Sequence, residues 1–263
     1  MSKNNHHFIP VTLQCQFASQ GEKGLFFFDK EKPEEGTKWR SFKTIFYKKH
    51  LNTLHLPDGM EDNSLEIFYD RNFENYLPQI IKKLRSQFTL TPEALSHDEE
   101  TILIQLFFNH MFRSPDVHGP MLERHTSEAE YSMQQIDNIR VAALREQPKD
   151  LLNFLSMIPI VIAKPSNPKD FFIVGSNPIL FLRNKGAQSG SLKDGKIELW
   201  AAFGSKLAVG FVSGWRGKKT VLLNSRQMSS WNMQLAAQST SFAGRSKPQI
   251  SALSKQIGRN PLK

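Results

Sequence analysis

The stretch SHDEETILIQLFFNHMFRSP, residues 96–115, contributes most to the prediction of the fold. Its first four residues have the Ser-x-x-Glu form of a capping box, in which two side chains satisfy the first backbone N–H groups of a helix. The helix is expected to end near Arg113, because Ser114 precedes a proline and is disfavoured in the helical conformation. The segment is apolar nearly all round, which predicts a helix at the centre of the core.

The residues before this helix predict a β-hairpin and then another helix. Two apolar, aromatic runs, GLFFFDKEK at 24–32 and TKWRSFKTIF at 37–46, flank a turn that contains Pro and Gly. From Leu65 to Leu84 the apolar residues recur at steps of three and four, the period of one helix face. Pro78 is expected to kink this helix.

The residues after the central helix change from helical to strand-like patterns. Helices are expected over about 120–145 and 150–158, and then short β-rich runs follow at 171–183, 197–205, 206–213 and 219–224. A last helix is expected over 225–242, with Ser225 as its N-cap.

The order of these elements predicts the α+β class. We expect an N-terminal β-hairpin and a helical middle packed with a C-terminal group of short antiparallel strands and a final helix. Residues 1–243 are expected to form one α+β domain. Residues 244–263 are polar and basic, and are expected to form a mobile tail.

Composition indicates a folded, soluble, cytoplasmic protein. Hydrophobic residues make up 39% and charged residues 22% of the chain, close to ordinary globular values. Cys15 is the single cysteine, which excludes an intramolecular disulfide and favours a reducing compartment. The N-terminus has no apolar signal core, and runs such as 156–163 are too short to cross a bilayer, so no membrane association is expected.

Charge is segregated along the chain, whose net charge is +9. From Phe181 onward 14 Lys and Arg stand against two acidic residues, whereas residues 1–180 hold 20 basic and 23 acidic residues. A basic C-terminal third attracts polyanions, with RNA, DNA and anionic lipid as candidates. The alternative is a solubilising surface with a disordered tail.

Four short motifs follow one another along the chain. They are His6-His7-Phe8-Ile9-Pro10 with Leu13 and Phe17, then Arg113-Ser114-Pro115, Ser176-Asn177-Pro178 and Asn224. In this order they resemble a microbial family known as domain of unknown function four-two-three-eight, over roughly residues 4–243. The resemblance implies an architecture rather than an activity. His6 stands where the family usually has Gln, and Ser176 where it usually has Asp, which removes a carboxylate that could ligate a metal or act as a base.

Two of the motif residues are candidates for chemistry. His7 suits a general acid or base, a metal ligand, or a structural residue that fixes the chain before Pro10 at a helix start. Arg113 shares a helix face with His110. A buried Arg must pair with a carboxylate or carbonyl, or meet an anion in a cleft. Its natural acidic partners are Glu66, Asp70 and Glu74, one helical turn apart.

No metal and no cofactor are predicted. His50 and His55 stand five residues apart in a loop, a spacing with little meaning by itself, and no metal-binding or phosphate-binding motif occurs. Asn177 follows a predicted strand in a turn, where its amide could face a cleft.

Basic and aromatic residues are interleaved near the C-terminal end of the strand-rich region. The aromatic members are Trp200, Phe203, Phe211 and Trp215, and the basic members are Arg216, Lys218 and Lys219. Such a surface can stack bases and neutralise phosphates. Aromatic residues on strands equally serve to pack a sheet against helices. The segment GWRGKKT at 214–220 is expected to be the exposed, nucleic-acid-binding part.

The leading functional hypothesis is a metal-independent, nuclease-like hydrolase that acts on a phosphate-containing substrate, RNA or DNA. His7 would be the general acid or base, Arg113 would stabilise phosphate charge, and Asn177 would position the substrate. The alternative is a non-enzymatic module that binds nucleic acid or protein, with structural histidines.

Overall fold

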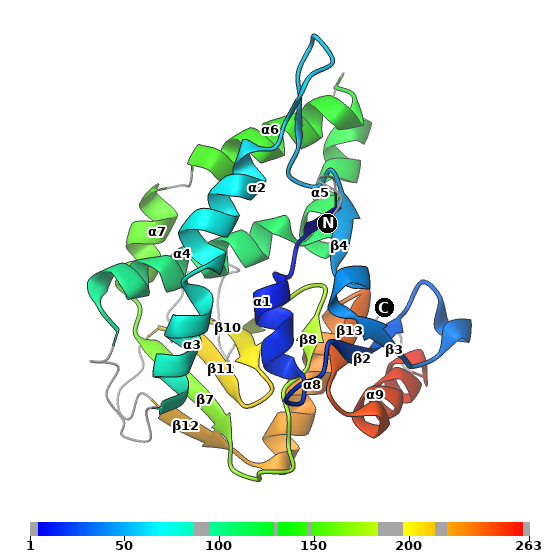
Figure 1. Ribbon diagram of the computed structural model, residues 1–263, viewed down its shortest axis with the longest axis vertical. Helices are drawn as coiled ribbons and strands as arrows, with labels where there is room; N and C mark the ends of the chain where they lie inside the picture. Colours follow the sequence, from blue (N-terminus) through cyan, green and yellow to red (C-terminus); the bar gives the residue numbers. More distant parts are fainter. Residues whose placement is uncertain are drawn as a thin grey trace.

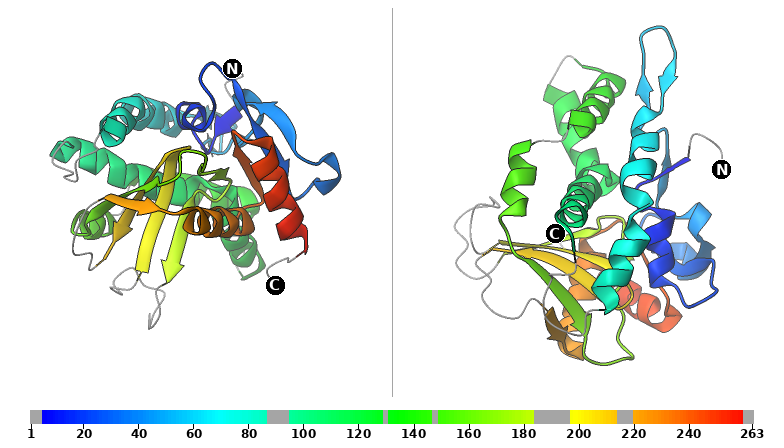
Figure 2. Two further views of the ribbon diagram at one scale, coloured as in Figure 1. Left: turned by 90° about the horizontal axis from the view of Figure 1, so that it is seen from below. Right: turned by 60° about the vertical axis from the view of Figure 1, so that its left-hand side comes forward.

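The computed structural model describes residues 5–86, 95–128, 131–146, 149–183, 197–213 and 220–259 (Figure 1). Helices and antiparallel or mixed sheets occur together, so the α+β prediction is confirmed. Helices of the middle of the chain lie on one face of the larger sheet, the helix Ser225–Gln238 packs on the other face through Trp231 and Trp200, and the smaller sheet lies beside the larger one (Figures 1 and 2). No helix in the described ranges is both long and apolar enough to cross a membrane.

The larger sheet has five strands in the order β12-β7-β11-β10-β9. Their bounds are Ile160–Pro165 for β7, Ile179–Arg183 for β9, Ile197–Gly204 for β10, Leu207–Val212 for β11 and Thr220–Leu223 for β12. Neighbours are antiparallel except β12, which runs parallel to β7. Strands β9 to β12 lie within the predicted short runs, whereas β7 was not predicted as a strand.

The smaller sheet joins the two ends of the sequence. Its order is β3-β2-β13-β8, with bounds Lys38–Ser41, Gly24–Asp29, Ser241–Gly244 and Val174–Gly175. The antiparallel pair β2–β3 is the predicted hairpin. Strand β13 was expected to belong to the last helix, but it lies between β2 and β8.

The central helix is α4, His97–Arg113. The Ser96 side chain accepts from the Glu99 N–H, and the Glu99 side chain accepts from the Ser96 N–H, so the capping box is confirmed. Phe107 is fully buried and packs against Phe203 and Phe211 of the larger sheet, with ring centroids 5.7 and 4.7 Å away. Helix α4 therefore lies in the core, as its sequence predicts.

The remaining helices of the middle differ from prediction mainly in their bounds. They are α2 Ser64–Tyr69, a π-helical turn Asp70–Glu74, α3 Leu77–Ser86, α5 Pro115–Glu128, α6 Met133–Glu146 and α7 Lys149–Ser156. The predicted 65–84 helix is interrupted just before Pro78, which takes the second position of α3 where no intrahelical N–H bond is lost. Helix α5 starts earlier than expected because Pro115 suits a first helical position.

Two corrections concern the C-terminal end. Helix α8, Ser225–Gln238, is capped by Asn224 and not by Ser225, because the Asn224 side chain accepts from the Gln227 N–H. Residues 247–259 form helix α9, Lys247–Arg259, so the predicted mobile tail is wrong for this range. Helix α9 lies beside the smaller sheet (Figure 2, left), and its Ile250 and Leu253 are buried with residues of that sheet.

Candidate functional site

The N-terminal motif is folded into the molecule. Strand β1, Asn5–His7, pairs with β4, Tyr47–Lys49, and places His7 opposite Tyr47. The Phe8 N–H then donates to the Phe46 carbonyl at 3.0 Å. The short helix α1, Val11–Gln14, begins directly after Pro10, so the predicted helix start is found there, with Pro10 as the N-cap residue and not as the first helical residue. The segment is held by backbone bonds on both sides of the histidine pair.

The His7 ring is almost buried, and one of its nitrogens is occupied. Its Nε2 lies 3.1 Å from the Phe42 carbonyl oxygen, which fixes that nitrogen as the donor. Burial lowers the pKa of His7, and the bond to Phe42 opposes that effect only in part. The imidazole is therefore mainly neutral at neutral pH.

Arg113 is buried, and both of its Nη atoms have partners, whereas its Nε has no hydrogen-bond partner among the described residues. Its Nη2 donates to the His7 carbonyl at 2.7 Å, and its Nη1 and Nη2 pair with Glu74 and Glu66 at 3.3 and 3.1 Å. The guanidinium carbon lies 4.4 Å from the centroid of the Tyr69 ring. Only 3% of Arg113 is exposed. Two of the three predicted acidic partners are thus found, and the arrangement is a buried ion-pair network.

The same network reaches the other motif histidine. The backbone N–H of Asn52 donates to His6 Nδ1 at 3.0 Å, and the Asn52 amide donates to Glu66. His6 is almost fully buried. Glu66 thus connects His6, through Asn52, with Arg113.

A small cavity beside Arg113 carries further buried polar groups. It is lined by Pro10, Tyr69, Phe73, Glu74, Leu106, Asn109, His110 and Arg113. The side chains of Asn109 and His110 have no hydrogen-bond partner among the described residues. Burial raises the pKa of Glu74 and lowers that of His110 to about 3. The cavity offers about 10 Å³, room for a single water and not for a phosphate.

Hydrogen bonds connect the Ser176-Asn177-Pro178 turn to α5 and β13. Ser176 Oγ donates to the Asp116 carboxylate, which also accepts from the backbone N–H and the hydroxyl of Thr240 at 2.8 and 2.7 Å. Asp116 therefore supplies a carboxylate next to the position where the family usually has one. The Asn177 N–H donates to the Ser239 hydroxyl at 3.2 Å, and its side chain is half-buried.

Three motif segments meet at the C-terminal end of α4, through backbone groups. Arg113 donates to the His7 carbonyl, and the neighbouring Ser114 hydroxyl donates to the Ser176 carbonyl at 2.7 Å. The contact therefore uses the backbone of His7, and not its ring. These contacts hold the three motif segments together, so the motifs have a structural role at this point of the fold.

The predicted basic and aromatic surface divides into two parts. Trp200, Phe203 and Phe211 are buried in the larger sheet, as the packing alternative expected. The nucleic-acid-binding candidates Trp215, Arg216, Lys218 and Lys219 lie outside the described residues.

An open groove lies next to the β1–β4 pair, and sequence reasoning missed it. It measures about 260 Å³ and is lined by Phe8, Phe27, Asp29, Lys32, Glu35, Gly36, Lys38, Arg40, Thr44, Ile45, Phe46, Tyr47 and Ser241. Lys38 and Arg40 alternate along β3 and so share one face. The alternation of cations along β3 was the available sequence signal.

One group of side chains could hold a metal ion. His50, His55 and Glu61 each offer a ligand atom, and these atoms lie within 4.8 Å of one another. The sequence showed the two histidines but no pattern that linked them to Glu61.

Comparison with known proteins places the chain in a family. The model of the family described as "Protein of unknown function (DUF4238)" matches residues 5–199. The protein belongs to this family, which confirms the resemblance seen in the sequence motifs. Searches among curated proteins and among solved structures found no match.

Proposed function

We propose that this protein binds single-stranded nucleic acid, RNA or DNA, in the groove beside the β1–β4 pair. The observation that carries the proposal is the combination of a basic wall, Lys32, Lys38 and Arg40, with an aromatic floor. Cations that follow a sugar-phosphate backbone, together with rings on which bases stack, are the usual means of binding single strands without sequence preference.

The cations of the wall are accessible to phosphate. The side chains of Lys38 and Arg40 are 52% and 43% exposed. Both pair with Glu35, at 3.5 and 2.7 Å, and this carboxylate is itself partly exposed. Exposed pairs of this kind contribute about 0–1 kcal/mol, so a phosphate can compete with Glu35 for the two cations.

The floor next to this wall is aromatic, with ring surface exposed at Phe27 and Tyr47, whereas Phe46 is buried and contributes only by packing against Phe27. Phe27 and Phe46 pack edge to face with centroids 5.7 Å apart, and both line the groove. Tyr47 lines it as well and is 39% exposed. A base that stacks on an exposed ring of this kind gains roughly 1–3 kcal/mol.

The geometry favours binding over hydrolysis. A phosphate-stabilising Arg needs donors that a phosphate can reach, whereas the Nη donors of Arg113 are occupied by Glu66, Glu74 and the His7 carbonyl, and the cavity beside it has room for one water only. Hydrolysis by His7, Arg113 and Asn177 stays a prediction, and cleavage of the same labelled strands would reveal it. The other non-enzymatic alternative, a protein partner, is an outcome of the same experiment.

The test is fluorescence anisotropy with labelled single-stranded RNA and DNA over a range of salt concentrations. Each lost charge-assisted contact costs on the order of 1.5 kcal/mol, or about tenfold in affinity, so the double variant Lys38→Ala/Arg40→Ala should weaken binding roughly 100-fold. The slope of log affinity against log salt should fall by about 0.7 for each lost phosphate contact. Glu35→Gln should tighten binding, because it frees both cations.

The matched control is Lys149→Ala/Lys255→Ala, which removes two exposed cations from α7 and α9. It should bind as the unmodified protein does. Equal losses in both double variants, or no binding by the unmodified protein, would contradict the proposal. Cleavage that persists with a chelator and disappears in His7→Ala would restore the hydrolase hypothesis.

A further inference from the structure

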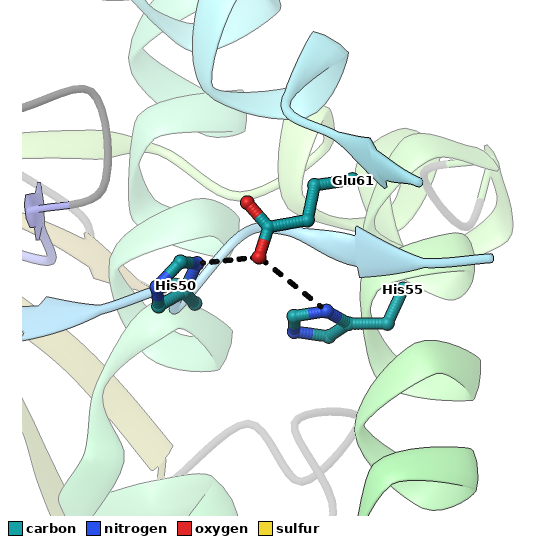
Figure 3. A group of neighbouring side chains, drawn as sticks. All are labelled: His50, His55 and Glu61. Carbon is teal, nitrogen blue, oxygen red and sulfur yellow. Dashed lines mark ion pairs between the residues drawn. The ribbon is translucent and has the colours of Figure 1, made fainter. Parts of the chain in front are cut away.

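The β5–β6 hairpin projects from the helical part of the molecule next to α6 (Figures 1 and 2). Its strands are Leu54–His55 and Glu61–Asp62, and His55 lies directly opposite Glu61. His50 precedes the hairpin and turns its ring to the same carboxylate (Figure 3). The Nδ1 atoms of His50 and His55 lie 3.4 and 3.8 Å from Glu61 Oε1.

We infer that His50, His55 and Glu61 form a binding site for a tetrahedral divalent transition metal, with Zn²⁺ as the representative ion. Zinc binds His nitrogen and carboxylate oxygen at about 2.0–2.2 Å, which places tetrahedral ligand atoms roughly 3.4 Å apart. The His50–Glu61 distance already has this value, and the His55–Glu61 distance is a few tenths of an ångström longer.

The contact between His50 Nδ1 and Glu61 lacks hydrogen-bond geometry, which also fits a metal ion between them. His50 Nδ1 is shielded from solvent, although the residue as a whole is half-buried, and it has no hydrogen-bond partner among the described residues. An unsatisfied buried polar atom costs about 1–3 kcal/mol. A metal ion between His50 and Glu61 would satisfy this nitrogen.

The backbone around the site is held in place without the ion. His50 has a φ of 54°, a left-handed conformation that His adopts more readily than most residues. The His55 backbone is clamped by the Asn138 amide, which accepts from its N–H at 3.0 Å and donates to its carbonyl at 2.7 Å. The ligands therefore need little rearrangement on binding.

The donor set selects the class of ion and leaves one position open. Two imidazoles and one carboxylate suit zinc and similar transition metals, whereas Ca²⁺ and Mg²⁺ prefer all-oxygen sites. Three protein ligands leave the fourth tetrahedral position to water or another molecule. The three side chains are 31% to 39% exposed, so an ion can enter from solvent.

The test is titration of the metal-stripped, full-length protein with Zn²⁺ in a calorimeter, and with Co²⁺ followed by visible absorption. We expect one ion per chain and the intense absorption of tetrahedral Co²⁺. His55→Ala and Glu61→Gln should each weaken binding more than tenfold, since even the loss of an outer-shell partner costs about 10–100-fold.

The matched control is His97→Ala, which removes an exposed histidine at the start of α4. It should retain the affinity and the spectrum. Circular dichroism checks that each variant is folded. Unchanged affinity in both site variants, or a weak octahedral Co²⁺ spectrum, would overturn the inference. The nucleic-acid assay is run separately with groove variants, so failure of one proposal leaves the other unaffected.

Discussion

Arg113 shows how burial decides between two roles of one side chain. Its neighbours Glu66 and Glu74 could be named from the sequence, because with Asp70 they follow one another at four-residue steps, so that they share one helix face. Whether the guanidinium is open to a substrate depends on the closure of α2, the π-helical turn and β1 around it. That closure is tertiary and leaves no local signal.

Removal of the Arg113 side chain should destabilise the protein severely. Arg113→Ala leaves two partly buried carboxylates without their cation, a loss that typically costs about 3–5 kcal/mol in the free energy of unfolding. Urea denaturation measures it. Arg71→Ala, at an exposed position of the same helical region, should change stability by less than about 0.5 kcal/mol. Similar values for the two variants would contradict the ion-pair assignment.

His110 should make stability depend on pH. Burial lowers its folded-state pKa to about 3, whereas in the unfolded chain it titrates near 6.5. Below pH 6.5 the unfolded state therefore binds a proton that the folded state does not bind. The free energy of unfolding falls as the pH is lowered, until the pH approaches 3. His110→Gln should reduce the slope of unfolding free energy between pH 6 and 4 by about 1.4 kcal/mol per pH unit. An unchanged slope would show that His110 is protonated in the folded protein.

At the scale of elements, local sequence patterns were sufficient to predict some helices and strands but not others. Helix α4 was predictable because its capping box and apolar run are contiguous. Helix α9 was missed because basic and polar residues surround its apolar positions, although Ile250, Leu253 and Ile257 follow the helical period. Strand β13 has only four residues, Ser241–Gly244, and its place is set by β2, more than 200 residues earlier.

Helix α9 should contribute to global stability. Ile250 is fully buried against Ile173 and β13, so Ile250→Ala should cost about 2–5 kcal/mol. Lys255→Ala, on the exposed side of α9, is the control and should change stability little. Thermal unfolding of both variants measures the difference. If Ile250→Ala left the melting temperature unchanged, the packing of α9 would not contribute to global stability.

At the scale of the whole molecule, the sequence motifs mark the contact at the end of α4, and only Phe8 of the N-terminal motif also lines the groove. Motif residues from three distant segments meet at the end of α4, and the order of these motifs was readable. The alternation of Lys38 and Arg40 was a weak signal for the groove, and it did not stand out because residues 29–40 hold four acidic and four basic residues and so carry no net charge. The cluster of His50, His55 and Glu61 could not be predicted either, because only the pairing of β5 with β6 brings the Glu61 carboxylate to the two histidines.

The place of β13 between β2 and β8 has a consequence for biosynthesis. Strand β2 ends at Asp29, and its partner β13 begins at Ser241. At a translation rate of about 5–20 residues per second, the open edge of β2 waits on the order of 10–40 seconds for that partner. During this time the hairpin presents unpaired backbone groups on an aromatic strand, the kind of edge that pairs wrongly. Nascent chains of this protein should therefore depend on chaperone protection until the last strand has left the ribosome.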